Sequence, residues 1–314
     1  MDLKIFENLK NKGIGNSTLQ LYLSNLKRLN NGAEIKNFNF LKDVEAIVEK
    51  IKDKAKNTRR TYLISIVSLL KQEPKFKKLY DRYYTLLMEY NKDLKVNNEK
   101  TEKQKENWIT QDQVKEIYDE LTKKVEPIIN KKKINVEDYN ELLQHLILSL
   151  YVLQPPRRNL DYQYAVIVNH WTPEMDTKYN YLDLENKKFH FNNFKTKKTY
   201  STQSVAISDE LMNVIKNFLK FHPKKKELKK KNAVIPFLVD VDGIPFETKN
   251  SITRILNKIF KKKIGASMLR NIYLTSKYSN NLQNLKNDAS AMGTSSNTIE
   301  NQYIKLDEPN NNEI

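Results

Sequence analysis

A polar interruption after the first 90 residues constrains the fold more than any other feature of this chain. Apolar spacing stops at Asn91 and resumes at Trp108, and the interval is dominated by charged and amide side chains. Such a stretch has too few apolar groups to join a core and is typical of an exposed linker, although a long loop inside one domain would look similar. A length of 314 residues favours two domains. We expect a helical domain over 1–92, a linker over 93–107, a second domain over 108–306 and a disordered tail over 307–314.

The first expected domain shows four segments with helical spacing of apolar residues. A helix capped by Ser17 or Thr18 ends near Asn30, and a second lies near 41–54. A third runs from about Asn57 until Pro74 stops it, because proline interrupts a helix. The last covers about 76–90.

The second expected domain mixes helices with a few short strands. A cap at Thr110 begins one helix, and a strongly apolar helix over about 136–153 ends at Pro155-Pro156. Residues 181–184 and 188–191 alternate like the two strands of a hairpin, with a third strand near 204–207. Helical spacing returns after Asp209. The predicted fold is therefore mainly α, with a small antiparallel β-sheet, in two domains.

Charge favours a polyanionic partner. Lys and Arg number 55 against 38 Asp and Glu, a formal net charge of +17. A surface this basic attracts nucleic acid, since binding releases condensed counterions. The alternative interpretation is a solvated surface in a lysine-rich, AT-biased genome.

Several classes of site are not expected. The chain has no cysteine, and its four histidines lack ligand spacing, so we expect no metal. No glycine-rich phosphate loop is present, so we expect no nucleotide and no other cofactor. The apolar runs are too short for a signal peptide or a membrane span. We expect a soluble intracellular protein located at DNA, with no membrane partner.

Tyr303 lies nine residues after the pair Gly293-Thr294, near the end of the basic chain. A phenolic oxygen can attack a DNA phosphodiester when cations stabilise the non-bridging oxygens and a donor protonates the leaving 5′ oxygen. Arginine suits the first role because its planar fork stays charged, and a flexible lysine suits the second. Candidate cations occur in order at 156–161, 193–197 and 267–270.

In this order the segments resemble the motifs of the tyrosine recombinases, the integrases of phages, viruses and mobile elements. The G-L-R-x-x-E motif is matched by 156–161, which puts the first arginine at Arg158 and its supporting acid at Asp161. The hairpin lysine motif is matched by 195–197, and the H-x-L-R motif by 267–270. Single matches are weak, and their order along nearly the whole chain carries the resemblance.

The resemblance implies that Tyr303 forms a 3′-phosphotyrosyl bond, that Arg158 and Arg270 stabilise the transition state and that Lys195 protonates the leaving oxygen. It also implies a two-domain clamp, with 1–92 as a helical core-binding domain and 108–306 as the catalytic domain. The partner it implies is double-stranded DNA, bound by a homo-tetramer on two DNA sites, with no cofactor. The alternatives left open are Arg157 for Arg158, and Lys197 or Lys198 for Lys195. Besides catalysis, we expect phosphate contacts from basic side chains, namely Lys56, Arg59, Arg60 and Lys197.

The sequence departs from the family pattern at its histidines. Ser267 and Thr294 occupy the two histidine positions, and Asn271 follows the second arginine. A hydroxyl can donate one hydrogen bond to a phosphate oxygen but cannot act as a base near neutral pH. Losing one oriented donor costs about 3–4 kcal/mol of transition-state stabilisation. Two alternatives therefore stay open: a DNA-binding protein that has lost catalysis, and an enzyme like the type IB topoisomerases.

Overall fold

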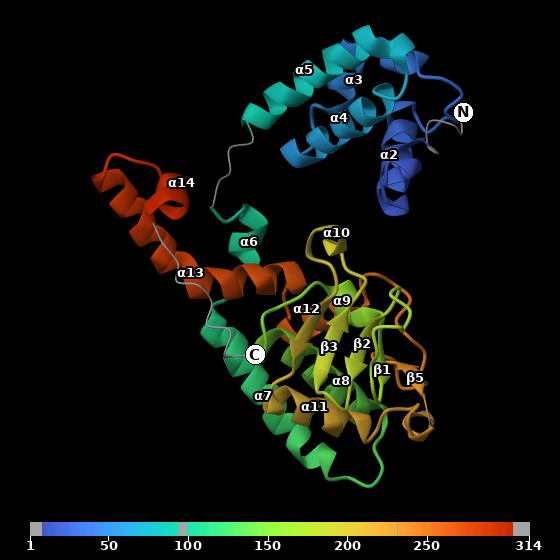
Figure 1. Cartoon of the computed structure of the whole chain (residues 1–314), viewed down its shortest axis with the longest axis vertical. Coiled ribbons are helices and arrows are strands. Elements are labelled where there is room, and N and C mark those ends of the chain that lie inside the picture. The colour runs from blue at the N-terminus through green and yellow to red at the C-terminus, as the bar shows by residue number, and fades with distance from the viewer. Residues whose placement is uncertain (1–7, 94–98, 231, 304–314) are drawn as a thin grey trace. The chain divides into compact units, whose positions relative to one another are not determined.

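The computed structural model describes residues 8–93, 99–230 and 232–303. The chain separates into two compact units, Met1–Glu99 and Lys100–Ile314. Both are mainly helical, and the second contains a small sheet (Figure 1). Each unit has its own buried apolar cluster.

The described part of the first unit contains several α-helices and two single 3₁₀ turns. They are α2 (Asn16–Leu29), η1 (Asn39–Leu41), α3 (Val44–Ile51), α4 (Lys56–Leu70), η2 (Pro74–Phe76) and α5 (Lys77–Asp93). Helix α4 packs against both α2 and α5. Leu26, Leu63 and Ile66 are fully buried between them, and the buried Asn25 amide donates to Ser65 Oγ at 3.0 Å.

The four expected helical segments are present, with corrected ends. Helix α2 begins after Gly15, which has an extended backbone and no side-chain cap, so the caps expected at Ser17 and Thr18 are wrong. The segment expected at 41–54 divides into η1 and the shorter α3, because Asp43 caps a new helix by accepting from Ala46 N at 2.9 Å.

The second unit is a mixed α/β assembly. Its helices are α6 (Glu102–Asn107), α7 (Gln111–Ile129), α8 (Val136–Val152), α9 (Asn159–Gln163), α10 (Lys197–Tyr200), α11 (Asp209–Leu219), α12 (Ser251–Phe260), α13 (Ala266–Ala291) and α14 (Ser296–Thr298), with the 3₁₀ turn η3 (Glu227–Lys229) and the π-helical turn η4 (Ile299–Tyr303). The strands are β1 (Ala165–Val168), β2 (Asn180–Asp183), β3 (Lys188–Phe191), β4 (Gln203–Ala206) and β5 (Val234–Pro236). Helix α8 is buried along most of its length and packs against α7, α11 and α12.

The sheet is mixed, which corrects the expected antiparallel arrangement. Its order is β4-β3-β2-β1-β5, and β1 pairs with β2 in parallel while the other neighbours are antiparallel. The predicted β2–β3 hairpin is present and turns through Lys187, whose φ is +50°. Strands β1 and β5 were not predicted. Their pairing extends the sheet by two strands on one side of the hairpin.

The interval expected as a linker contains helix α6, so that expectation is corrected over 102–107. Thr101 caps α6 in a reciprocal arrangement with Gln104, and Asn107 Oδ1 accepts from Lys263 N at 2.9 Å. Helix α6 therefore belongs to the second unit. Residues 94–98 of the expected linker and the whole expected tail at 307–314 lie outside the described residues.

None of the helices in the described parts of the chain combines the length and the apolar character that crossing a membrane requires.

Candidate functional site: an arginine-lined groove

A groove of about 360 Å³ lies in the second unit where α8 ends. It brings together residues from the α8–α9 connection, the segment between β3 and β4, and the first turns of α13. They are Gln154, Pro155, Pro156, Arg157, Arg158, Asp161, Phe194, Thr196, Tyr200, Gln203, Val205 and Arg270.

The backbone at the groove is fixed by the sequence around the two prolines. Pro155 and Pro156 cannot continue α8, so the chain leaves the helix and restarts at α9 with Arg158 in the N-cap position. Asn159 then ties α9 in place. Its Oδ1 accepts from Tyr151 Oη at 2.7 Å, and its Nδ2 donates to Thr253 Oγ1 at 2.8 Å.

Arg157 is held on several sides. Its Nε donates to Asp161 Oδ2 at 3.0 Å and its terminal nitrogen donates to Gln203 Oε1 at 3.0 Å. The guanidinium also lies over the Phe191 ring, 3.7 Å from the centroid, in a cation–π contact. The motif predicted that Asp161 supports Arg158. In the structure, the salt bridge joins Asp161 to Arg157.

Asp161 is almost completely enclosed. Burial raises the pKa of its carboxyl group, and the charge and hydrogen bond of Arg157 offset only part of that rise. Its position between the α9 backbone and Arg157 makes it a support for the groove wall rather than a group presented to a ligand.

Arg158 and Arg270 are the other two arginines of the groove. Both are half-buried and line the groove, and within the described residues neither side chain has a hydrogen bond or salt bridge to the protein. The chain has eight arginines among its 55 basic residues, and three of them line this groove. In a lysine-rich protein, this concentration of bidentate donors indicates an anion site with defined geometry.

The expected lysines lie at the edge of the groove. Lys195 is exposed and does not line it, but its neighbours Phe194 and Thr196 do. Lys197 begins α10, and its Nζ donates weakly to Thr177 O at 3.4 Å. Of these two lysines, Lys197 therefore directs its ammonium group to Thr177, and Lys195 does not.

Tyr303 and Thr294 are not brought into the groove. Ser267 is exposed on the first turn of α13, close in sequence to Arg270. From Arg270, α13 continues for on the order of 30 Å, and α14 lies at its far end (Figure 1). Tyr303 follows in η4 with 60% of its surface exposed.

Gly293 and Thr294 have a local structural role at that distant end. Gly293 has a φ of +66° and its N–H bonds to Ser290 O, while Thr294 N bonds to Ala289 O at 2.9 Å. These two bonds form a Schellman motif, which ends a helix and requires a left-handed residue. The glycine is thus explained by helix termination alone.

In the first unit, two of the expected DNA-contacting residues are engaged within the protein. Arg60 Nε donates to Asn91 Oδ1 at 2.6 Å, and Arg59 lies 5.5 Å from the centroid of the Tyr90 ring. Lys56 is exposed. The two arginines therefore connect α4 to α5.

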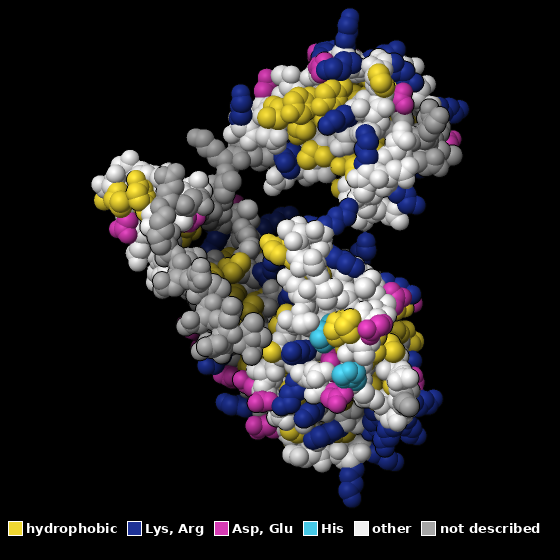
Figure 2. Space-filling model, viewed as in Figure 1, with side chains coloured by type: hydrophobic (Ala, Val, Ile, Leu, Met, Phe, Trp, Pro, Cys, Tyr) yellow, Lys and Arg dark blue, Asp and Glu magenta, His cyan; other side chains and the backbone are white. Residues whose placement is uncertain are grey.

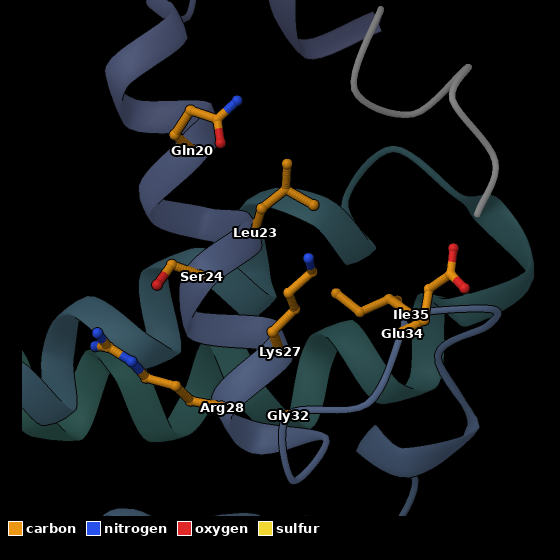
Figure 3. Close-up of a pocket in the computed structure, with 8 residues that line it drawn as sticks. All are labelled: Gln20, Leu23, Ser24, Lys27, Arg28, Gly32, Glu34 and Ile35. Carbon is orange, nitrogen blue, oxygen red and sulfur yellow. The ribbon is translucent and has the colours of Figure 1, made fainter.

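A second groove, of about 590 Å³, lies along α2 and was not predicted (Figure 3). Gln20, Ser24, Lys27 and Arg28 project from α2, and Glu34 and Ile35 come from the segment that follows it. Lys27 extends toward Ile35, whereas the Arg28 side chain is directed away from Ile35. The signal available in the sequence was the spacing of these four polar residues along one helical face.

The arginine-lined groove also contains members that sequence reasoning missed. Gln203 and Tyr200 lie in the segment that the lysine motif introduces, and Arg157 was only an alternative. Among the described residues, no cluster of three His, Cys, Asp or Glu side chains is arranged to bind a metal ion.

Comparison of the chain with protein-family models, with curated proteins and with solved structures finds no match. The resemblance to tyrosine recombinases thus stays a prediction from the motifs.

Proposed function

We propose that the protein cuts and rejoins DNA through a covalent tyrosyl intermediate, as a site-specific recombinase. The observation that carries this proposal is the pair of half-buried guanidiniums, Arg158 and Arg270, which line one groove without a side-chain hydrogen bond or salt bridge to any described residue. Two planar donors that line one groove suit a phosphodiester, whose two non-bridging oxygens gain charge in the transition state.

In the proposed reaction, Tyr303 Oη attacks the phosphorus and forms a 3′-phosphotyrosyl bond while the bond to the 5′ oxygen breaks. The phenolic proton passes to water. Lys195 gives a proton to the leaving 5′ oxygen, and Arg158 and Arg270 bind the non-bridging oxygens. Rejoining is the reverse, with the 5′ hydroxyl as nucleophile, so the bond energy is retained and no nucleotide is consumed.

The reaction requires the segment after Ala291 to approach a groove. Tyr303 is remote from Arg270 in this structure because α13 separates them. Either the segment moves within its own molecule or it reaches the groove of a second copy. The second route agrees with the homo-tetramer on two DNA sites that the family resemblance implies.

The first unit supplies surfaces suited to duplex DNA. Helices α2 and α4 contain no Asp or Glu, and the α2 groove presents Lys27 and Arg28 beside Gln20 and Ser24. Basic side chains are also spread over the visible faces of both units (Figure 2). Cations attract the phosphates, and amide and hydroxyl groups can bond to phosphates or base edges.

A covalent-capture experiment tests the proposal. The full-length protein is mixed with a pool of nicked duplexes that carry a randomised 20-base-pair region, so that a cleaved strand cannot be rejoined, and adducts are collected after denaturation. We expect an adduct that is absent in Tyr303→Phe and retained in Tyr278→Phe, an exposed tyrosine on α13. An adduct that survives Tyr303→Phe would contradict the assigned nucleophile.

The second candidate function is DNA binding without cleavage. It is favoured by one specific observation, namely that Tyr303 and Thr294 lie outside the arginine-lined groove. Its signature in the same experiment is retention of duplexes by wild-type protein before denaturation, with no adduct from any member of the pool.

A further inference from the structure

The arginine-lined groove contains two aromatic side chains that the proposed reaction does not use, the buried Phe194 and the exposed Tyr200. Tyr200 ends α10 and lines the groove together with Arg158 and Arg270. It is 60% exposed. The ring contributes little to packing the core, and its exposed face beside Arg158 and Arg270 is available to a ligand.

The backbone after Tyr200 is held in a costly conformation. Ser201 has φ +56° and ψ −157°, a region occupied almost only by glycine. Such strain persists only when surrounding contacts impose it, and it is concentrated at functional sites. Here the turn is fixed by Tyr200 N bonding to Thr196 O and Ser201 N bonding to Lys197 O.

The strand that follows connects this turn to the groove floor. Gln203 begins β4 two residues after Ser201 and accepts from Arg157, which is itself bound to Asp161. The turn is thus anchored at both ends. The backbone that carries Tyr200 is therefore held at the groove.

We propose that Tyr200 is a stacking platform for the nucleobase next to the phosphate bound by Arg158 and Arg270. This inference rests on the proposed function, because it takes DNA as the ligand of the groove. A cationic groove with an exposed aromatic ring is the combination that binds single-stranded nucleic acid, since every base has a face that stacks. The base concerned would be unpaired at the point of cleavage.

The test uses a single-stranded DNA decamer with a central 2-aminopurine, whose fluorescence is quenched by stacking, and a matched decamer lacking that base. Full-length wild type, Tyr200→Phe and Tyr200→Ala are compared at 0.2 M salt. Tyr164→Ala, an exposed tyrosine outside the groove lining, is the matched control.

We expect Tyr200→Ala to bind the base-containing decamer roughly 5- to 150-fold more weakly and to lose the quenching. Tyr200→Phe and Tyr164→Ala should behave as wild type, and affinity for the decamer lacking the base should not change. The double variant Arg158→Ala/Arg270→Ala should also lose the quenching, which localises it to the groove.

Two results would overturn the inference. One is equal quenching by Tyr200→Ala and wild type. The other is a Tyr200→Phe protein as defective as Tyr200→Ala, which would assign the effect to the hydroxyl group. The proposed function fails separately, by the absence of a Tyr303-dependent adduct, whatever the decamer shows.

Discussion

Arg157 and Asp161 form an enclosed ion pair, with Nε and Oδ2 3.0 Å apart and the side chains only 18% and 4% exposed. The adjacent Arg158 has no such partner within the described residues. The two neighbouring arginines therefore differ: Arg157 is paired inside the groove wall, and Arg158 lines the groove without such a pair.

Because only Arg157 is paired, replacing Arg157 or Arg158 by alanine should have different effects on stability and on DNA binding. Arg157→Ala leaves a buried carboxylate unpaired and should lower the free energy of unfolding by about 3–5 kcal/mol. Arg158→Ala should change it by less than about 0.5 kcal/mol while weakening DNA binding. Urea unfolding and binding measurements on both proteins check this, and Arg157→Met/Asp161→Leu should recover most of the lost stability. Equal destabilisation by the two alanine variants would contradict this difference.

Two buried histidines predict acid sensitivity. Burial lowers the pKa of His145 to about 4 and that of His222 to about 4. The unfolded chain binds protons at these histidines near pH 6.5, and the folded protein does so only near pH 4. Stability should therefore be complete above pH 6.5 and fall as the pH drops toward 4.

For each histidine, the free energy of unfolding should be about 2 kcal/mol lower at pH 5 than at pH 7. Replacing His145 by Gln keeps a polar partner for Thr122, 3.0 Å from the ring, and should remove its share of the loss. Urea unfolding at both pH values measures the change. An unaltered pH dependence in His145→Gln would mean that this ring is not kept neutral.

Sequence reasoning succeeded where one segment carries its own signal. Thr110 caps α7, the apolar run over α8 stops at two prolines, and the β2–β3 hairpin alternates around a short turn. It failed for β1 and β5. Strand β1 is a short apolar run without alternation, and β5 has three residues including Pro236, so their strand character comes from sheet partners and not from local pattern.

The same limit applies to the candidate site. The motif 156–161 drew attention to the correct segment, yet it could not show which arginine reaches Asp161, because that depends on the rings of Phe191 and Phe194 and on Gln203. Gly293 illustrates the converse, since its spacing to Tyr303 suggested chemistry while its backbone ends α13.

The end of α13 is predicted to depend on that glycine. Gly293→Ala places a Cβ at φ +66°, where the left-handed backbone costs about 1–2 kcal/mol. Amide hydrogen exchange at Met292 and Thr294 should accelerate roughly 5- to 30-fold. Gly293→Asn should show a smaller effect, because asparagine tolerates this region better. Exchange unchanged by alanine would exclude the Schellman motif as the element that holds this end.

The α2 groove predicts a change in the salt dependence of DNA binding. Lys27 and Arg28 line it, and α2 carries no acidic residue. If both neutralise phosphates, Lys27→Ala/Arg28→Ala should reduce the slope of log affinity against log salt by about 1.8, because each lost contact removes about 0.9.

Fluorescence anisotropy with a 30-base-pair duplex from 50 to 200 mM NaCl measures the slope. Lys77→Ala is the matched control, since that lysine is already paired with Asp81 and its loss should leave the slope nearly unchanged. Equal slopes for the double variant and the wild type would remove α2 from the DNA-binding surface.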